Sequence, residues 1–498
     1  MDGSTVSIIA AFVLYLGVMI AIGLKTSKRT SNTQDFFLGA RSAGPWITAL
    51  SAEASDMSGW LLMGLPGVAY LGGMKEAFWT AAGLIAGTYL NWLFVAKRLR
   101  KYTIHAGNSI TIPEFFTNRF KDKSHLLSLV SVVFIIIFFT IYAASGFVAC
   151  ARLFNSVFGI PYLWALALGI VVILTYTLLG GYLAVCSTDF VQGTLMFFAL
   201  VITAVIGCFA LGGPSAAVAK VSEFGAEFLN PFVTGPGEKF GALEIISALA
   251  WGLGYFGMPH ILVRFMGLRS NHDVKVSRKI AMIWVTIAFA GALLVGAFGR
   301  AYLLPLDLAA GGAQDTVFIQ TIIKMFPAFI AGIFLCAILA AAMSSADSQL
   351  LVAASAFSRD IYGILLNREA SEKQLLLMSR ITVIAVALAA AIIAVDPTSS
   401  IFGLVSYAWA GFGATFGPLV LLSLFWKGAT RNGALAGLVS GGVVVIVWKN
   451  LSGGLFNLYE IVPGFLVCLI VSVVVSLLDK PANEEVLAEY HAYTKLGD

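Results

Sequence analysis

Residues 52–60, "AEASDMSGW", place a carboxylate and several hydroxyls inside a long apolar stretch. With a helical rise of 1.5 Å per residue, Asp56 would lie about 16 Å into that stretch, near the midplane of a bilayer. A charge at this depth on a lipid-facing helix costs several kcal/mol, so an intramembrane carboxylate marks a functional site by default. Ser55, Ser58 and Gly59 weaken the helix around it. We therefore expect an unwound turn beside a polar site lined by protein.

A second polar feature is the stretch "LAAAMSSADSQLL", residues 339–351. Hydroxyl and carbonyl oxygens are the ligands that hard cations such as Na⁺ prefer. Carbonyls of the unwound turn, such as those of Ala54 and Met57, would complete a small cage. Serines in membrane helices also mediate helix packing, so this alternative stays open for the serine face. The face consists of the residues at i, i+3, i+4 and i+7 of one helix: Ala341, Ser344, Ser345 and Ser348.

The third feature is "WGLGYFGMPH", residues 251–260, which puts three glycines and Pro259 into one apolar span. Taken alone, a packing kink explains it as well as a binding site does. It lies five apolar segments after the first interruption. Two broken helices at matching places in the two halves of a chain indicate a transporter built from inverted repeats. Because each repeat would have an odd number of helices, the two copies would cross the membrane in opposite directions.

The elements that must carry these residues are membrane helices. The chain is 59% hydrophobic and only 11% charged, with a mean hydropathy of +0.91, whereas a soluble domain carries roughly 25% charged residues. The first segment is expected to be retained, because no basic residue precedes it as in a signal peptide. The sequence predicts an all-α polytopic membrane protein with about thirteen spanning segments: 5–24, 46–70, 78–96, 124–153, 162–183, 190–212, 241–263, 280–304, 325–357, 378–396, 400–426, 432–449 and 457–479.

The distribution of basic residues predicts the orientation. If the N-terminus is outside, 24 of the 31 Lys and Arg residues fall in inside loops or the tail. The positive-inside rule therefore favours an N-out, C-in topology, which agrees with an odd number of helices. The tail after residue 479 would be a short cytoplasmic extension that can form a helix.

Several classes of function are excluded or disfavoured by what the sequence lacks. It has no P-loop motif for ATP and no H-E-x-x-H zinc motif, and its five histidines form no ligand cluster. Its five cysteines lie in or beside apolar segments and are interpreted as packing residues. The net charge of +5 reflects topology rather than a nucleic-acid partner. The outside stretches near 213–240 and 305–324 are too short for a core of their own.

At these same residues the chain resembles the sodium/solute symporter family, and within it the bacterial sodium/proline branch. The resemblance extends from the second predicted helix to the twelfth. The resemblance is carried by "SDMSGWLLMGLPG", "FFTIYAASG", "WGLGYFGMPH", "SYAWAGFGATFGP" and "TRNGALAG", and "LLGGYLAVCSTDFVQ" is similar to a family-level signature. Within these stretches, "SDMSGW" and the string of tryptophan, tyrosine and proline in "WGLGYFGMPH" favour the proline branch.

The resemblance implies thirteen helices and a five-plus-five inverted-repeat core. The expected parts are 1–45 (first helix and cytoplasmic loop), 46–240 and 241–427 (the two repeats), and 428–498 (two peripheral helices and the tail). It implies Na⁺-coupled uptake of L-proline by alternating access, in the cell membrane of a bacterium. The expected partners are proline, Na⁺ as the coupling ion and the lipid bilayer, and no enzymatic activity is expected.

Residue roles follow from the resemblance position by position. It implies a Na⁺ site formed by Ala54, Met57, Ala341, Ser344 and Ser345, with Asp56 and Asp189 on the ion pathway. Arg41 matches a functionally sensitive arginine at the cytoplasmic edge. Aromatic rings suit the apolar ring and the ammonium of proline. The implied substrate-binding residues are Ser58, Gly59, Tyr142, Trp251, Tyr255 and Pro259.

Three positions depart from the pattern of some relatives. Met258 stands where some carry glutamine, which would alter affinity or specificity if the position touches the substrate. Glu53 and Asp347 add carboxylates that either partner structural groups or tune ion affinity. A Na⁺ symporter for another solute (a betaine, pantothenate or a sugar) is the nearest alternative function, and an ion channel is a more distant one. H⁺ coupling is a further alternative, although the serine face favours a metal cation.

Overall fold

The computed structural model describes residues 3–27, 33–179, 181–235, 237–308, 312–481 and 483–495. Most of these residues lie in helices, as the apolar segments predict. Three residues used above lie outside the described ranges: Lys28 and Arg29, which enter the orientation argument, and Gly180 of the family signature.

The first half of the chain runs from the N-terminus to a short hairpin. Its elements are α1 (Gly3–Ser27), α2 (Thr33–Leu38), η1 (Gly39–Arg41), α3 (Pro45–Gly59), η2 (Trp60–Gly64), α4 (Leu65–Gly72), α5 (Met74–Leu90), η3 (Asn91–Val95), α6 (Ala96–His105), α7 (Ile112–Phe120), α8 (Leu126–Phe158), α9 (Tyr162–Leu179), α10 (Tyr182–Ala210), α11 (Pro214–Ser222), η4 (Ala226–Leu229), β1 (Val233–Gly235) and β2 (Glu238–Lys239).

The second half begins with another interrupted helix. Its elements are α12 (Ala242–Leu249), η5 (Ala250–Phe256), α13 (Pro259–Met266), α14 (Asp273–Tyr302), η6 (Ala313–Thr316), α15 (Val317–Met325), α16 (Ala328–Ser355), η7 (Ala356–Leu366), α17 (Glu372–Ala394), α18 (Ile401–Phe425), α19 (Arg431–Trp448), η8 (Gly454–Asn457), α20 (Ile461–Leu478) and α21 (Glu484–Lys495).

Ten helices in the described residues are long and apolar enough to cross a membrane, and the bent pair α12/η5 with α13 raises the number to eleven. Two further predicted segments appear as helices outside that count. One is the interrupted run α3–η2–α4, and the other is α9, whose apolar part Tyr162–Thr175 is shorter. The all-α prediction is thus confirmed in its coarse form, while the number thirteen stays a prediction.

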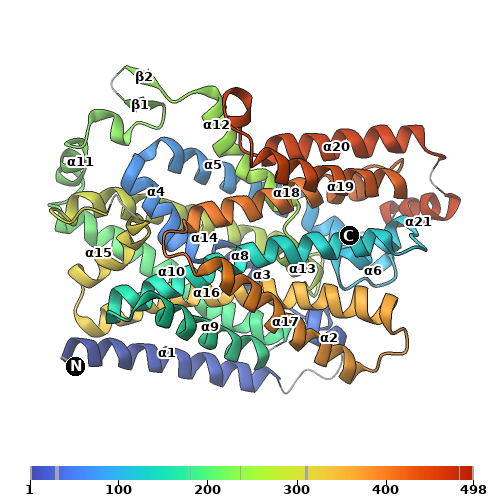
Figure 1. The fold of residues 1–498 in the computed structure, drawn as a ribbon, viewed down its shortest axis with the longest axis horizontal. Coiled ribbons are helices and arrows are strands. Elements are labelled where there is room, and N and C mark those ends of the chain that lie inside the picture. The colour runs from blue at the N-terminus through green and yellow to red at the C-terminus, as the bar shows by residue number, and fades with distance from the viewer. Residues whose placement is uncertain are drawn as a thin grey trace.

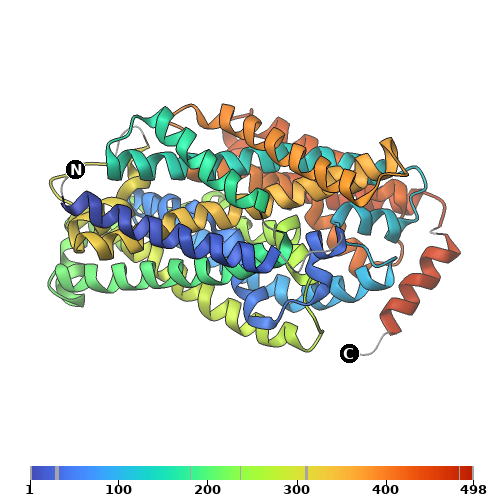
Figure 2. The ribbon, with the colours of Figure 1, turned by 90° about the horizontal axis from the view of Figure 1, so that it is seen from below.

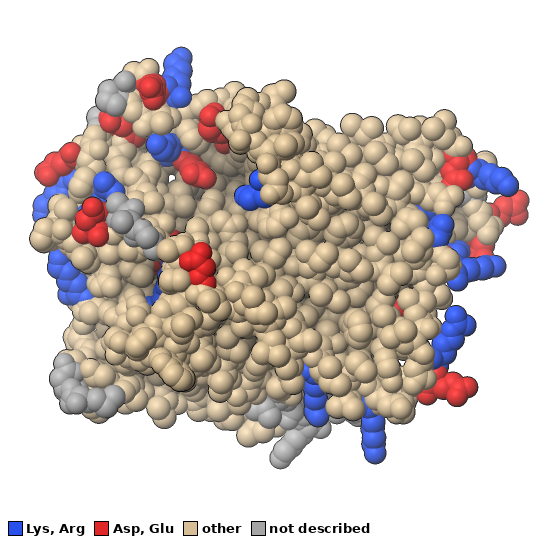
Figure 3. All heavy atoms as spheres, viewed as in Figure 1, with Lys and Arg blue, Asp and Glu red and all other residues tan. Residues whose placement is uncertain are grey.

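The long helices lie side by side along the long axis of the molecule (Figure 1). Helix α1 forms one edge, and α19 and α20 form the opposite edge. The C-terminal helix α21 lies at the same end as α6 in both views (Figures 1 and 2). On the face in Figure 3, Lys, Arg, Asp and Glu gather at the two ends, and a wide uncharged band separates them. This band is the surface expected to face lipid.

The interior of the bundle is built by α16 and α18. In their most apolar windows, 78% and 83% of residues are buried, against 33% for α1, α17 and α20. Helices α3, α8 and α10 pack directly against α16. The buried face of α16 is rich in alanine and serine, which let helix backbones approach closely. The features predicted from the sequence therefore meet inside the bundle.

The loops contain more structure than the sequence analysis predicts. The described part of the stretch 213–240 contains α11, η4 and the antiparallel pair β1–β2, so the described residues form a helical fold with one small hairpin. The second outside stretch carries η6 and the start of α15. The tail forms α21, as expected.

Candidate functional site

The interruption predicted in 52–60 is a backbone break at Ser58. This residue has φ 46° and ψ −171°, a positive φ that non-glycine residues seldom adopt. Its hydroxyl accepts the N–H of Trp60 at 3.1 Å, which holds the turn. The chain then continues as the π-helical η2. Because Ser58 is buried, this strained turn must be stabilised by the packing around it.

The second predicted interruption is also present. The chain passes from α12 into the 3₁₀ segment η5, then through Gly257 and the extended residue Met258 into α13. The two parts are bent by 43°. Pro259 occupies the first turn of α13, where its missing N–H leaves no bond unmade.

Glycines of this second segment permit close contacts between elements. A Cβ on Gly252 would lie 2.3 Å from the carbonyl oxygen of Gly83 on α5, and one on Gly254 would lie 1.9 Å from Nε1 of Trp409. Both positions therefore exclude any side chain. The packing interpretation of these glycines is correct, and the same packing brings Trp251 and Tyr255 to the centre of the bundle.

Next to the first break, the serine face of α16 meets the backbone of α3. The Ser344 hydroxyl lies 2.9 Å from the Ala54 carbonyl oxygen and 3.2 Å from that of Ala341. The hydroxyl of Ser345 is buried and has no hydrogen-bond partner among the described atoms. The Met57 carbonyl accepts the N–H of Trp60. The structure thus brings the predicted oxygen ligands onto facing helices and leaves one hydroxyl unsatisfied, which fits a small hard cation.

Asp56 lies on the same turn and contacts two tyrosines. Its Oδ2 accepts the hydroxyl of Tyr255 at 2.7 Å, and its backbone carbonyl accepts the hydroxyl of Tyr142 at 2.8 Å. Oδ1 is buried and has no hydrogen-bond partner among the residues that the structure describes. The carboxylate therefore joins the two broken helices, with one oxygen still able to accept a donor or a cation.

A small enclosed cavity lies between these residues. Its volume is about 10 Å³, roughly the space of one water molecule. The cavity of this conformation is therefore closed to any solute larger than water. It is lined by Asp56, Met57, Trp60, Leu84, Tyr142, Trp251, Val405 and Trp409.

Aromatic side chains around the cavity include several that sequence reasoning missed. Trp60 stacks on Trp251 with centroids 5.4 Å apart, and the Trp409 indole donates to the Trp251 carbonyl at 2.7 Å. Phe402 and Tyr459 lie 5.1 and 5.5 Å from Trp251. Trp409 belongs to the quoted motif "SYAWAGFGATFGP", which is the one signal that could have identified it.

The remaining predicted substrate residues lie beside the cavity rather than in its wall. Ser58 and Gly59 form the break itself, and a Cβ on Gly59 would lie 2.7 Å from that of Ala149 on α8. Pro259 is buried at the start of α13. Tyr255 reaches the cavity through its bond to Asp56.

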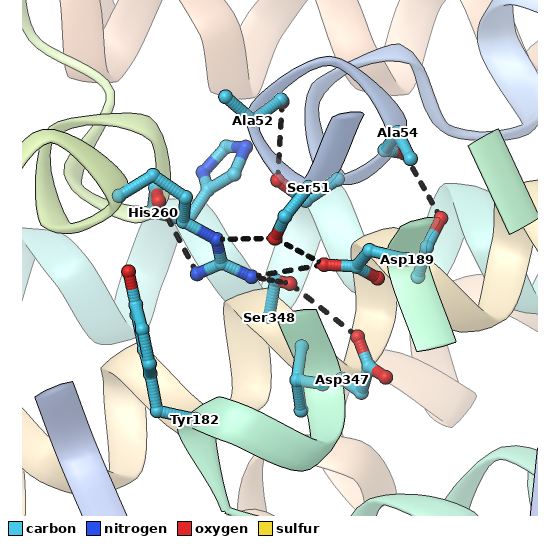
Figure 4. A network of polar contacts seen from close by, with 12 residues as sticks. Ser51, Ala52, Ala54, Tyr182, Asp189, His260, Asp347 and Ser348 are labelled. Atoms are coloured by element: carbon cyan, nitrogen blue, oxygen red, sulfur yellow. Dashed lines mark hydrogen bonds and ion pairs between the residues drawn. The ribbon is translucent and has the colours of Figure 1, made fainter. Parts of the chain in front are cut away.

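A buried polar network contains Asp189 (Figure 4). Arg264 of α13 donates to Asp189 Oδ2 at 3.3 Å, to Ser51 at 3.0 Å and to Ser348 at 2.5 Å. Ser51 in turn donates to the same Asp189 oxygen at 2.6 Å. One guanidinium thereby connects α3, α10, α13 and α16. Sequence reasoning did not single out Arg264, because an arginine near a helix end gives no sign of its burial.

Arg41 lies at the end of the bundle that carries α6 and α7. Its guanidinium donates to the carbonyls of Met266 at 2.6 Å and Ser109 at 2.8 Å, and to the side chains of Asn108 and Thr103. Burial, with repulsion from Arg100, lowers the pKa of Arg41 to about 10, so it stays charged at neutral pH. It joins the α2–α3 connection to the end of α13.

The structure shows the surroundings of the three positions that depart from the pattern of some relatives. Glu53 is buried, and its Oε1 accepts the Trp92 indole N–H at 3.4 Å, while Oε2 has no hydrogen-bond partner in the described part of the chain. Asp347 accepts the Ser348 hydroxyl at 3.4 Å. Met258 is fully buried where α13 begins, and it does not line the cavity.

Comparison with known proteins identifies the family. The model of the family described as "Sodium:solute symporter family" matches residues 36–441. The chain belongs to the sodium:solute symporter family. This member of the family is 47% identical to the sodium/proline symporter of Escherichia coli, over 97% of each chain. It is 46% identical to a high-affinity proline transporter of Bacillus subtilis, over 95% of this chain and 99% of that protein.

Solved structures agree with this assignment at the level of the fold. A substrate-bound, outward-open Na⁺-coupled sialic acid symporter matches 96% of this chain and 99% of its own, with a TM-score of 0.80 and 21% identity. The transporter MhsT in complex with L-phenylalanine gives a TM-score of 0.54 at 17% identity, covering 88% and 98% of the two chains. The family and the apolar helices make this chain a multi-pass protein of the bacterial cytoplasmic membrane.

Proposed function

We propose that this symporter couples the uptake of L-proline to the entry of Na⁺ by alternating access. The observation that carries the proposal is the position of the break at Ser58. On one side Ala54 faces the hydroxyl of Ser344, and on the other Asp56 and Met57 face the aromatic cavity. An ion and a solute bound there would share one strained turn, so the binding of either changes the geometry that the other meets.

The proposed Na⁺ ligands are the carbonyls of Ala54, Met57 and Ala341 and the hydroxyls of Ser344 and Ser345. All five residues are buried, and the unpartnered Ser345 hydroxyl supports the assignment. Asp56 lies two residues after Ala54, so its charge would favour a cation in this region. The donor set is neutral, which suits a monovalent ion that must also leave.

The proposed proline site is the cavity enclosed by Tyr142, Trp251 and Trp409 together with Trp60. Apolar ring faces suit the pyrrolidine ring, and they attract its ammonium group. Free N–H groups at the broken helices would hold the carboxylate. Since the closed cavity has room for about one water, proline entry requires these side chains to move. The names of the Escherichia coli and Bacillus subtilis relatives support proline as the solute.

Asp189 and Arg264 are proposed to form part of the inward route. Their network lies beside the serine face, toward the end of the bundle that carries Arg41. Separation of Arg264 from Asp189 and Ser348 would free oxygen atoms for a departing Na⁺. Arg41 would hold the inner end of α13 against the adjoining loops.

The proposed architecture is thirteen spans, N-out and C-in, with repeats at 46–240 and 241–427. The presence of an interrupted helix near the start of each proposed repeat supports this division. The hairpin end, with β1 and β2, would then be outside, and α21 would be cytoplasmic.

The test is uptake of labelled proline into proteoliposomes with and without an inward Na⁺ gradient, competed by a panel of other solutes. We expect uptake only with Na⁺ and competition only by proline and close analogues. Proline uptake that is equal with and without the Na⁺ gradient would refute the proposal. If a betaine, pantothenate or a sugar inhibited uptake more strongly than unlabelled proline does, that compound would be the transported solute instead.

A further inference from the structure

We propose that the imidazole of His260 donates a hydrogen bond to the carboxylate of the solute as the solute leaves the cavity toward the inner end of the bundle. His260 follows Pro259 in the first turn of α13. It is not among the substrate residues that the sequence implies. The inference rests on the proposed function and adds to it a second, inner position for proline.

The imidazole of His260 is buried without a hydrogen bond. The residue is 0% exposed, and within the described part of the chain neither ring nitrogen has a partner. In Figure 4 the dashed line at His260 ends on its backbone carbonyl, which accepts an N–H of Arg264 at 3.3 Å. A neutral imidazole has one donor and one acceptor nitrogen, and leaving them unpaired in the interior is costly. We therefore expect a ligand to supply the missing partner in another conformation.

The groups around the imidazole are aromatic or already paired. The rings of Phe139 and Tyr142 on α8 have their centroids 5.6 and 6.2 Å from that of the imidazole. The Tyr142 hydroxyl donates to the Asp56 carbonyl at 2.8 Å. The guanidinium of Arg264 is held by the buried network described above. The imidazole is thus a free hydrogen-bonding group between two occupied ones.

His260 lies between the cavity and the proposed inward route. Tyr142, which contacts the imidazole, lines the cavity. Arg264 stands one helical turn further along α13 and belongs to the network with Asp189. Helix α13 then ends where Arg41 donates to the Met266 carbonyl. A solute that moves from the cavity toward the Arg41 end therefore meets His260 once Tyr142 has moved aside.

The chemistry of this position suits a small amino or imino acid. An imidazole N–H can donate to a carboxylate oxygen, and the first turn of α13 adds the positive end of a helix dipole. Arg264 does not compete for the carboxylate, because Asp189 already pairs with it. The rings of Phe139 and Tyr142 can contact the apolar pyrrolidine ring. The carboxylate and the ring of proline would thus each find a matching surface.

The test compares the two faces of the membrane. Right-side-out and inside-out vesicles containing the full chain, with equal Na⁺ on both sides, give the half-saturating proline concentration for proline exchange at each face. His260→Phe removes both nitrogens and keeps a ring. His260→Asn and His260→Gln each retain an N–H near one of the two nitrogen positions. The matched control is His272→Phe, at an exposed histidine before α14.

We expect the half-saturating concentration at the inner face to rise about 10- to 100-fold in His260→Phe, because a hydrogen bond to a charged group is lost. The outer value and both values of the control should stay unchanged. At least one of the two amide variants should recover part of the loss. An unchanged inner value, an equal rise at both faces, or no recovery in either amide variant would overturn the inference.

The carboxylate is tested by competition with prolinamide, which lacks it. Proline should compete better than prolinamide at the inner face of the unaltered chain and lose this advantage in His260→Phe. An equal advantage in both proteins would show that His260 does not bind the carboxylate.

Thermal stability separates binding from a structural role. An apolar ring at position 260 leaves no unpaired nitrogen, so His260→Phe should keep or raise the thermal midpoint Tm. A marked fall in Tm in both His260→Phe and the smaller His260→Leu would show that the imidazole has a structural partner, and would overturn the inference. Absence of proline exchange by the unaltered chain at both faces would instead overturn the proposed function.

Discussion

Asp56 has one hydrogen-bonded and one unpartnered carboxylate oxygen in the candidate site, within the described part of the chain. Tyr255 holds Oδ2, whereas Oδ1 is buried without a partner. A buried acceptor in this state is costly unless a donor or a cation reaches it. On the same turn the Ala54 carbonyl accepts the Ser344 hydroxyl at 2.9 Å, so a cation bound there would replace this hydrogen bond and could also approach Oδ1.

Asp56→Asn removes this charge while it preserves shape. Loss of a charged partner costs about 1.5–3 kcal/mol, so the half-saturating Na⁺ concentration should rise roughly 10- to 100-fold. The measurement is proline uptake as a function of Na⁺ concentration in proteoliposomes. Asp396→Asn, at an exposed loop position, is the control and should leave the curve unchanged. An unaltered Na⁺ curve for Asp56→Asn would remove this residue from the ion pathway.

The buried ion pair between Arg264 and Asp189 leads us to predict the thermal stability of two variants. Removing one partner of a buried ion pair costs about 3–5 kcal/mol, because the other charge stays buried and unpaired. Arg264→Gln alone should therefore lower the thermal midpoint markedly in detergent. Combining it with Asp189→Asn should recover part of the loss, since no charge is then left alone. Additive losses in the double variant would show that the two groups do not depend on each other.

At the level of elements, the two broken helices meet α5, α8, α16 and α18 through small residues. Sequence reasoning located both breaks, because Gly, Ser and Pro disrupt helices by local means. It did not predict that Ser58, rather than Gly59, takes the positive φ, because the packing of other helices around the buried turn stabilises this conformation. Trp409 and Arg264 were missed for the same reason: their roles depend on which helices become neighbours.

Gly252 tests the packing of the second broken helix. In Gly252→Ala the new Cβ would lie 2.3 Å from the Gly83 carbonyl oxygen, so η5 and α5 must separate. Such overpacking costs about 1–3 kcal/mol and should displace Trp251. We expect a lower thermal midpoint and a higher KM for proline. Gly17→Ala on α1, where nothing lies within 4 Å, should be neutral or stabilising. Equal behaviour of the two variants would contradict the close contact.

At the scale of the whole molecule, most charged side chains on the face in Figure 3 lie toward the two ends, with a largely uncharged surface between them. Which end faces outward can be checked by labelling one introduced cysteine at a time in a background without the five native cysteines. With a membrane-impermeant maleimide, Lys239→Cys should react in intact cells, and Lys373→Cys only after permeabilisation. Both positions are exposed, so a reversed pattern would reverse the proposed orientation.

Coupling to Na⁺ also predicts a response to voltage. Inward movement of one positive charge contributes about 2.3 kcal/mol per 100 mV, which corresponds to roughly 50-fold accumulation of proline before any Na⁺ concentration gradient acts. Proteoliposomes with a potassium diffusion potential, inside negative, should therefore accumulate proline at equal Na⁺ on both sides. Accumulation that is independent of the potential would indicate electroneutral transport.

The buried guanidinium of Arg264 also constrains the order in which the protein is built. Asp189 and Ser51 are synthesised before Arg264, and Ser348 is synthesised after it. Among the described residues, the cation that pairs with Asp189 is Arg264 of α13, and a solitary carboxylate is unfavourable in lipid. We therefore expect the N-terminal half to be less stable before α13 docks against it. A nascent chain ending before residue 259 is expected to be a substrate for membrane proteases, whereas one that includes α13 should persist.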